Sequence, residues 1–233
     1  LDAIVVGDQN SFHQTNNEAE TARPILCGRR PISAPACVPF PTVDTERKRM
    51  ERLKPLKPEE LTPEQMEVYA AIAAGPRGQV RGPLAMWLHR PGLANRAQAL
   101  GQYCRYDSSL SPRLSELAIL LMARTWMSEF EWWAHKPIAL KAGVAEDVVE
   151  AIRTGRKPAF VKEDERVIHE FLTELHATRN VPDELYQRAM AVLGKDQVVD
   201  LVGLAGYYTL ISMTINVFGV VPPDGSAPEL VRA

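Results

Sequence analysis

Apolar residues recur at helical spacing along most of the chain after residue 50. Leu114, Leu117, Leu121 and Thr125 lie three or four residues apart and follow the cap-like pair Ser111-Pro112. This pattern predicts a helix over residues 111–127. The positions between them are also largely apolar, so we expect this helix to be buried on every side. Part of that burial is expected to come from a second subunit.

Capping residues and stop signals predict further helices on both sides of residues 111–127. Thr62-Pro63-Glu64-Gln65 combines an N-cap, a first-turn proline and a capping-box glutamine, and Gly143 and Gly194 are stop signals. The expected helices cover residues 62–74, 91–107, 128–142, 146–154, 163–178, 183–193 and 196–218, and residues 75–83 (GPRGQVRGP) are expected to form a loop. No alternating run of strand length is present, so the sequence predicts an all-α fold.

The first 49 residues differ from the remainder of the chain. The segment PILCGRRPISAPACVPFPTVD holds five prolines and has neither helical nor strand periodicity, which predicts an extended or disordered N-terminal segment over residues 1–49. The helical domain is expected over residues 50–222, with a C-terminal tail over residues 223–233. Met50 is one candidate for the natural start of the chain.

Composition narrows the class of protein. A hydrophobic share of 45% and a charged share of 24% are ordinary for a soluble globular domain. The formal net charge of −2 gives no reason to expect nucleic acid or an anionic membrane as a partner. The most apolar stretch, residues 198–221, is interrupted by Asp200, several glycines and Asn216. It is therefore expected to be a buried helix rather than a membrane span.

The cysteines argue against disulfide or metal chemistry. Cys27, Cys37 and Cys104 are odd in number and lack the spacing of a metal site or a redox pair. These features favour a reducing, cytoplasmic location.

Four polar residues stand out inside the apolar region. Glu116, Ser128, Glu131 and His135 follow one another at intervals of twelve, three and four residues, and the last three share one helical face. A carboxylate four residues before an imidazole can hydrogen-bond it and raise its pKa, which suits general acid–base catalysis near neutral pH. The alternative is an exposed helix pair that contributes a few tenths of a kcal/mol.

Glu116 falls within the helix that is expected to be buried. A carboxylate there must be paired, hydrogen-bonded or protonated, because an unpaired buried charge is very costly. That environment favours a second proton-relay group. The alternative is a first-turn glutamate stabilised by the helix dipole.

The intervals among these four residues, together with the string Glu131-Trp132-Trp133-Ala134-His135, resemble the core motif of the carboxymuconolactone decarboxylase / alkylhydroperoxidase D superfamily. The resemblance covers about residues 50–222. In the peroxidase branch, cysteines occupy the positions of Ser128 and Glu131. Their absence excludes a dithiol reaction at these positions, and the EWxxH string is similar to the decarboxylase-like branch.

The resemblance implies an all-α domain that assembles into homotrimers or homohexamers and needs neither a cofactor nor a metal. It implies a carboxy-lyase-like enzyme that acts on a small carboxylated lactone or related ring acid. His135 would then be the proton donor, Glu131 would orient it, and Glu116 would be a relay or second acid. A metal site made from these three residues is conceivable, but the ligand set is not specific.

Other residues are candidates for binding the substrate. Ser128 could hydrogen-bond it or mark a helix boundary, and Trp132 could form an apolar wall or pack in the core. Arg124 could bind an anionic group, as could Arg81 or Arg105, and His89 could line the pocket or end a helix. Two other function classes stay open: a peroxidase-related oxidoreductase, which the missing dithiol disfavours, and a non-catalytic oligomeric small-molecule-binding protein.

Overall fold

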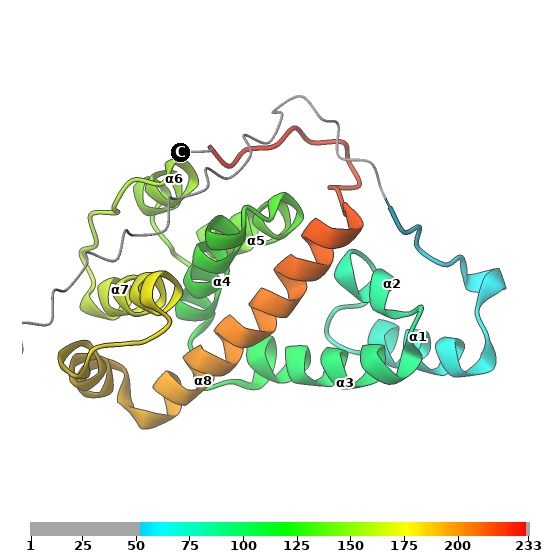
Figure 1. The fold of residues 1–233 in the computed structure, drawn as a ribbon, viewed down its shortest axis with the longest axis horizontal. Helices are drawn as coiled ribbons and strands as arrows, with labels where there is room; N and C mark the ends of the chain where they lie inside the picture. The colour runs from blue at the N-terminus through cyan, green and yellow to red at the C-terminus, as the bar shows by residue number, and fades with distance from the viewer. Residues whose placement is uncertain (1–51, 232–233) are drawn as a thin grey trace, which may run out of the picture. The chain divides into compact units, whose positions relative to one another are not determined.

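The computed structural model describes residues 52–231, and within them every regular element is helical (Figure 1). The all-α prediction is therefore confirmed. The N-terminal segment expected over residues 1–49 lies outside the described residues. In chain order the elements are the 3₁₀-helix η1 (Pro58–Glu60), α1 (Pro63–Ala74), α2 (Pro83–Trp87), α3 (Pro91–Gln102), the π-helix η2 (Tyr103–Asp107), α4 (Pro112–Trp126), α5 (Glu129–Lys141), α6 (Glu146–Thr154), α7 (Glu163–Thr178) and α8 (Asp183–Phe218).

Local signals set most of these boundaries. The Thr62 hydroxyl accepts the Gln65 N–H, and the Gln65 side chain accepts the Thr62 N–H, which completes the expected capping box of α1. Gly194 interrupts α8 with a non-helical backbone (φ 80°, ψ 165°), so the two helices expected on either side of it meet at a kink. Helix α2 was not predicted, because five residues are too few to show a periodic pattern.

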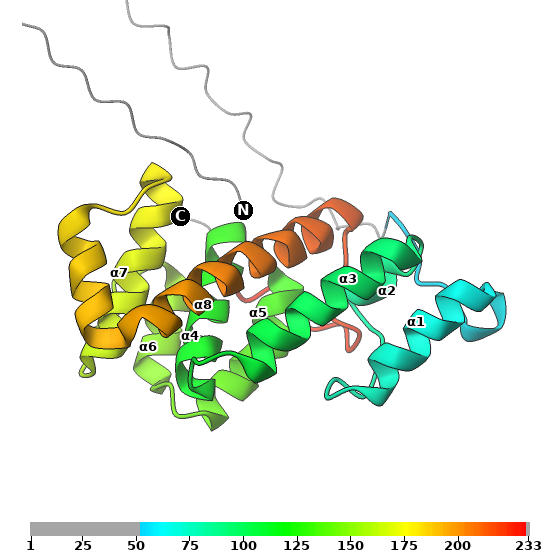
Figure 2. The ribbon, with the colours of Figure 1, turned by 90° about the horizontal axis from the view of Figure 1, so that it is seen from below.

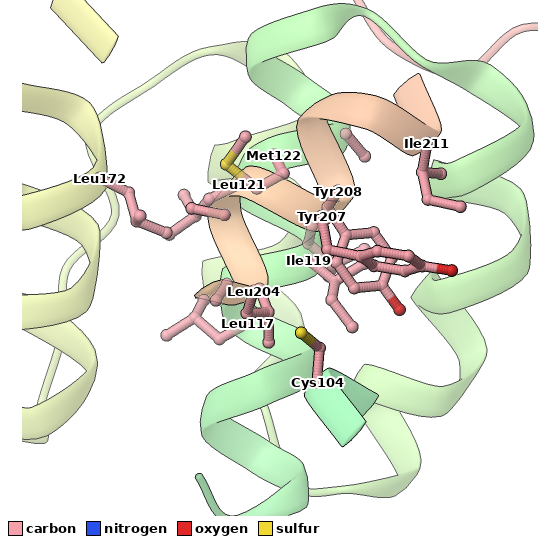
Figure 3. Close-up of a cluster of buried hydrophobic side chains, with 14 of the residues drawn as sticks. Cys104, Leu117, Ile119, Leu121, Met122, Leu172, Leu204, Tyr207, Tyr208 and Ile211 are labelled. Atoms are coloured by element: carbon pink, nitrogen blue, oxygen red, sulfur yellow. The ribbon is translucent and has the colours of Figure 1, made fainter. Parts of the chain in front are cut away.

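Helix α4 forms the centre of the core. It packs against α5, α7 and α8, and all its residues from Leu114 to Ala123 are buried. Figure 3 shows Leu121 and Met122 of α4 beside Leu172 of α7, with Leu117 next to Leu204 of α8. The burial expected of residues 111–127 is therefore found over residues 114–123, and the contribution expected from a second subunit stays a prediction. Elements of the same chain cover this helix.

Helix α8 crosses the domain beside α4 and α3 (Figures 1 and 2). By length and composition alone it could span a membrane, but 61% of its most apolar window is buried inside the protein, as in the core helix of a folded domain. Its outer side carries exposed apolar side chains, namely Val199, Val202, Met213 and Val217.

The chain turns back after α8. Residues 219–231, which we call the C-terminal strap, run from the end of α8 along α5 to α6 (Figure 1). The Leu230 side chain is buried in the core, and the Val231 N–H donates to the Arg153 carbonyl at 3.2 Å. The sequence marks residues 223–233 as a tail, and over residues 223–231 this tail packs on the domain.

Candidate functional site

His135 lies between two carboxylates in the interior of the domain. Its Nδ1 is 2.6 Å from Glu116 Oε2, and its Nε2 is 2.9 Å from Glu131 Oε1. Glu116 comes from α4, whereas Glu131 is four residues earlier on α5. All three side chains are only 5% exposed. The predicted meeting of these residues is confirmed, and their catalytic roles stay a prediction.

The surroundings of His135 favour its charged form. Burial of the ring opposes that charge, but the charges and hydrogen bonds of Glu131 and Glu116 outweigh burial, so the pKa of His135 is raised above its ordinary value. The charged ring can donate an N–H to each carboxylate. Tyr208 of α8 approaches the ring edge-on at 5.5 Å, and burial, followed by the nearby carboxylates, raises the pKa of its phenol.

Arg105 extends this line of charges on the side of Glu116. Its Nε is 3.8 Å from Glu116 Oε1, and its guanidinium lies 5.1 Å from the centre of the Tyr106 ring. Both residues belong to the π-helix η2, an element that often occurs at functional sites. The line therefore runs Arg105–Glu116–His135–Glu131 and alternates in sign when His135 is protonated.

A pocket of about 240 Å³ opens beside the end of this line. Glu131 and His135 border it, whereas Glu116 does not. Its other polar lining includes three arginines and three tyrosines: Arg77, Arg81, Arg105, Tyr106, Tyr207 and Tyr208. Apolar contacts come from α2, α5 and α8. The pocket thus combines a proton-carrying group with several cationic side chains.

Arg77 and Arg81 come from the loop between α1 and α2. Arg77 donates to the Gln98 carbonyl at 3.3 Å, and the Arg81 guanidinium lies 5.4 Å from the Trp133 ring centre. Within residues 52–231, neither forms an ion pair with an acidic side chain, in contrast to Arg105. Their charges are therefore available to an anionic ligand.

Two glycines allow the pocket wall to form. At Gly82, where φ is +60°, a Cβ atom would lie 2.4 Å from the Phe130 ring. At Gly101 a Cβ atom would lie 2.0 Å from the Tyr207 oxygen and 2.6 Å from Arg77 Nη2. Any side chain at either position would displace residues that line the pocket.

The four residues expected to bind substrate lie elsewhere, and none borders this pocket. Ser128 is fully buried at the N-cap of α5, where its hydroxyl has no hydrogen-bond partner among residues 52–231. Trp132 is fully buried and donates to Glu229 at 3.3 Å. Arg124 reaches the carbonyls of Arg153 and Val231, and His89 Nε2 lies 2.9 Å from the Lys54 carbonyl.

Two further observations bear on redox and metal chemistry. Cys104 is buried and free, and burial raises the pKa of its thiol. In the part of the chain that the structure describes, no group of three or more His, Cys, Asp or Glu side chains is arranged to hold a metal ion.

Comparison with known proteins supports the fold. The sequence matches no protein-family model and no curated protein. Among solved structures, it is similar to the alkylhydroperoxidase AhpD core of an uncharacterized peroxidase-related protein from Ralstonia eutropha JMP134. The identity is 15% and the TM-score 0.61, over 74% of this chain and 92% of that one. The chain therefore has the alkylhydroperoxidase D-like helical fold.

Proposed function

We propose that this protein is a cofactor-independent lyase that decarboxylates a small carboxylated lactone or related ring acid by general acid–base catalysis. The observation that carries the proposal is the buried line Arg105–Glu116–His135–Glu131, which ends at a pocket bordered by three arginines. The alkylhydroperoxidase D-like fold includes decarboxylases as well as peroxidases, so it is compatible with this reaction but does not select it.

The geometry favours Glu131 as the group that exchanges a proton with the substrate. Both nitrogens of His135 are engaged by carboxylates, and Glu131 is the carboxylate of the line that borders the pocket. His135 would supply its proton through Glu131, and Glu116 would hold the opposite side of the ring. These roles differ from those that the sequence resemblance implies, in which His135 donates the proton directly to the substrate and Glu131 only orients the His135 ring.

The proposed decarboxylation consumes one proton and releases CO₂ as its only leaving group. When the C–COO⁻ bond breaks, CO₂ leaves and the bonding electron pair stays on the ring as a dienolate. The proton on Nε2 of the protonated His135 moves to the Glu131 carboxylate, the resulting carboxylic acid delivers a proton to the ring carbon and becomes a carboxylate again, and solvent restores the proton on His135. Arg105 borders the pocket and is 3.8 Å from Glu116, so its guanidinium can stabilise the developing oxyanion.

The arginines also supply a means to bind the substrate as an anion. Guanidinium groups bind carboxylates through paired, charge-assisted hydrogen bonds. Arg77 and Arg81 lie on the loop side of the pocket, and they have no acidic partner within residues 52–231. Three aromatic hydroxyl-bearing rings complete the wall, so a ring acid can be both stacked and neutralised there.

A peroxidase reaction is the weaker alternative. Ser128 and Glu131 occupy the positions at which the peroxidase branch has cysteines. Cys104 is 2% exposed, with a raised thiol pKa, whereas a reactive cysteine needs access and a lowered thiol pKa.

The test is release of CO₂ from a γ-carboxy lactone by the full chain. We expect His135→Ala and Glu131→Gln each to lower kcat by about two to four orders of magnitude, the range for a general acid–base residue. We expect Arg77→Met chiefly to raise KM, since it removes a charged contact away from the proton line. Glu170→Gln, which removes an acidic partner of Arg188 between α7 and α8, is the matched control.

Two results would contradict the proposal. Full activity in Glu131→Gln would remove the acid–base role from this residue. Tight binding of ring acids without turnover would instead favour a non-catalytic binding protein.

A further inference from the structure

The helix that carries Glu131 and His135 contains a proline. Pro137 lies inside α5, two residues after His135. Proline has no N–H, so the Trp133 carbonyl loses its helical donor, and the proline ring crowds that carbonyl, which weakens the helix at this point. The segment that holds the acid–base pair is therefore a weak helix, and its orientation depends on contacts from outside.

The C-terminal strap supplies such contacts along α5. The Glu229 carboxylate accepts from Trp132 Nε1 at 3.3 Å and pairs with Lys136 at 2.5 Å. The Glu229 N–H donates to Glu129 at 2.9 Å, and Trp133 Nε1 donates to Asp224 at 2.8 Å. These four α5 residues span the helix from its first residue to the position just before Pro137.

The strap and the site occupy opposite sides of α5. With about 100° of rotation per residue, positions 129, 132, 133 and 136 gather on one face, whereas positions 131 and 135 point away from it. On the site side, His135 is faced by Glu116 of α4 and Tyr208 of α8, with Arg105 of η2 behind Glu116. A rotation of α5 about its axis would therefore break the strap contacts and the His135–Glu116 contact together, whereas Glu131 would turn with His135.

The far end of the strap is anchored on α6 and in the core. Arg153 of α6 donates to the Glu229 carbonyl at 2.8 Å and accepts the Val231 N–H at 3.2 Å. The Leu230 side chain is 6% exposed. The strap is thus fixed at both ends, by α8 and by α6, and Glu229 lies where it can resist movement of α5.

We propose that the C-terminal strap sets the rotation of α5 and that Glu229 is the positioning residue that keeps His135 and Glu131 aligned with Glu116. Its effect on activity rests on the acid–base role proposed above, but its effect on the geometry of His135 does not. Glu229 does not border the pocket, so it acts through α5 and not on the substrate.

The test is the titration of His135 in Glu229→Ala, followed by NMR of the ring C–H signals of the full chain. The His135 signal is assigned by its loss in His135→Gln. We expect the midpoint of the titration to fall, because a rotated ring loses its contact with Glu116 and keeps only Glu131, which is on the same helix. With a substrate, we expect kcat to fall by up to about 100-fold, the effect of a misplacement of about 1 Å. KM should change little, because none of the pocket arginines is on α5.

Glu229→Gln keeps an acceptor for Trp132 but loses the charge that pairs with Lys136, so it should lower the midpoint by less. If Glu229→Ala does not fold, the titration is measured in Glu229→Gln instead. An unchanged midpoint of the His135 titration in the variant that folds would overturn the proposal. A fall in melting temperature with unchanged titration would likewise show a purely structural contact. Glu170→Gln, which removes a different surface ion pair, should leave the midpoint in place. Absence of turnover in the wild-type chain would refute the lyase function without affecting this result.

Discussion

Replacement of Glu116 by glutamine tests the centre of the site without a substrate. Glu116 Oε2 is 2.6 Å from His135 Nδ1, and both side chains are 5% exposed. The substitution keeps the size of the side chain and one hydrogen-bonding oxygen but removes the charge. The ring then retains Glu131 at 2.9 Å as its remaining carboxylate, and Arg105 loses its acidic neighbour at 3.8 Å.

The expected loss of stability follows from burial. Removing one partner of a buried ion pair costs about 3–5 kcal/mol, because the other charge stays buried without compensation. Glu131 compensates His135 in part, so we expect a loss near the lower limit, about 3 kcal/mol. For a domain of this size, 1 kcal/mol changes the melting temperature by about 2–4 °C. Glu116→Gln should therefore lower it by about 6–12 °C near pH 6.

The pH dependence of this difference is the sharper observation. The pKa of His135 is raised in the folded protein, so the stability that it contributes is fully present below the unfolded value, about 6.5. That contribution is lost as the pH rises through the folded pKa. The gap in melting temperature between wild type and Glu116→Gln should hence narrow from pH 6 upward, as measured by calorimetry in a pH series. A gap that stays constant or widens over this range would refute the argument, and Glu170→Gln should show no such trend.

Three other predictions concern chemistry and assembly. The sequence resemblance implies that Ser128 and Glu131 replace the cysteines of the peroxidase branch, so thiol-dependent hydroperoxide turnover should not exceed a thiol-free background, and turnover that survives Cys104→Ser would contradict this. A chain that begins at Met50 should keep its melting temperature within a few degrees, because unpacked segments add little folding free energy; loss of soluble protein would show otherwise. Light scattering should detect a homo-oligomer that Val202→Glu weakens, whereas a wild-type species of 25.9 kDa would count against assembly.

The sequence predicts the helices well because their signals are local. Capping at Thr62, the break at Gly194 and the apolar spacing of residues 111–127 each depend on neighbours within a few positions. The prediction fails where the determinant is distant in sequence. The cover of α4 comes from α5, α7 and α8 of the same chain, and no periodicity within α4 distinguishes a neighbouring helix from a second subunit. Self-association therefore stays a prediction, and we expect the exposed apolar face of α8, rather than α4, to form the contact between subunits.

For the site, the sequence finds the three residues that meet and names Arg81 and Arg105, which border the pocket, among its candidates for binding an anion, but it does not single them out or find Arg77. Glu131 and His135 share a helix, so their contact follows from spacing alone, whereas Arg77 is brought to the pocket by the loop between α1 and α2. The loop string GPRGQVRGP does hold a signal, since its glycines and prolines predict a loop and its two arginines can each bind an anion through paired hydrogen bonds. Ser128 shows the reverse case: it shares the face of Glu131 in sequence, yet it lies at the buried N-cap and does not border the pocket.

The charges of the site argue that its ligand is an anion. With His135 protonated, the side chains of the line and the pocket carry four positive charges, on Arg77, Arg81, Arg105 and His135, against two negative charges, on Glu116 and Glu131. A small, partly buried pocket holds such an excess at a cost in self-repulsion unless a counter-charge is present. A carboxylate would supply that counter-charge, and its loss as CO₂ would return the pocket to the state that attracts the next substrate. In the proposed reaction the same excess would stabilise the negative charge of the dienolate intermediate, so one set of residues would both bind the substrate and stabilise the transition state.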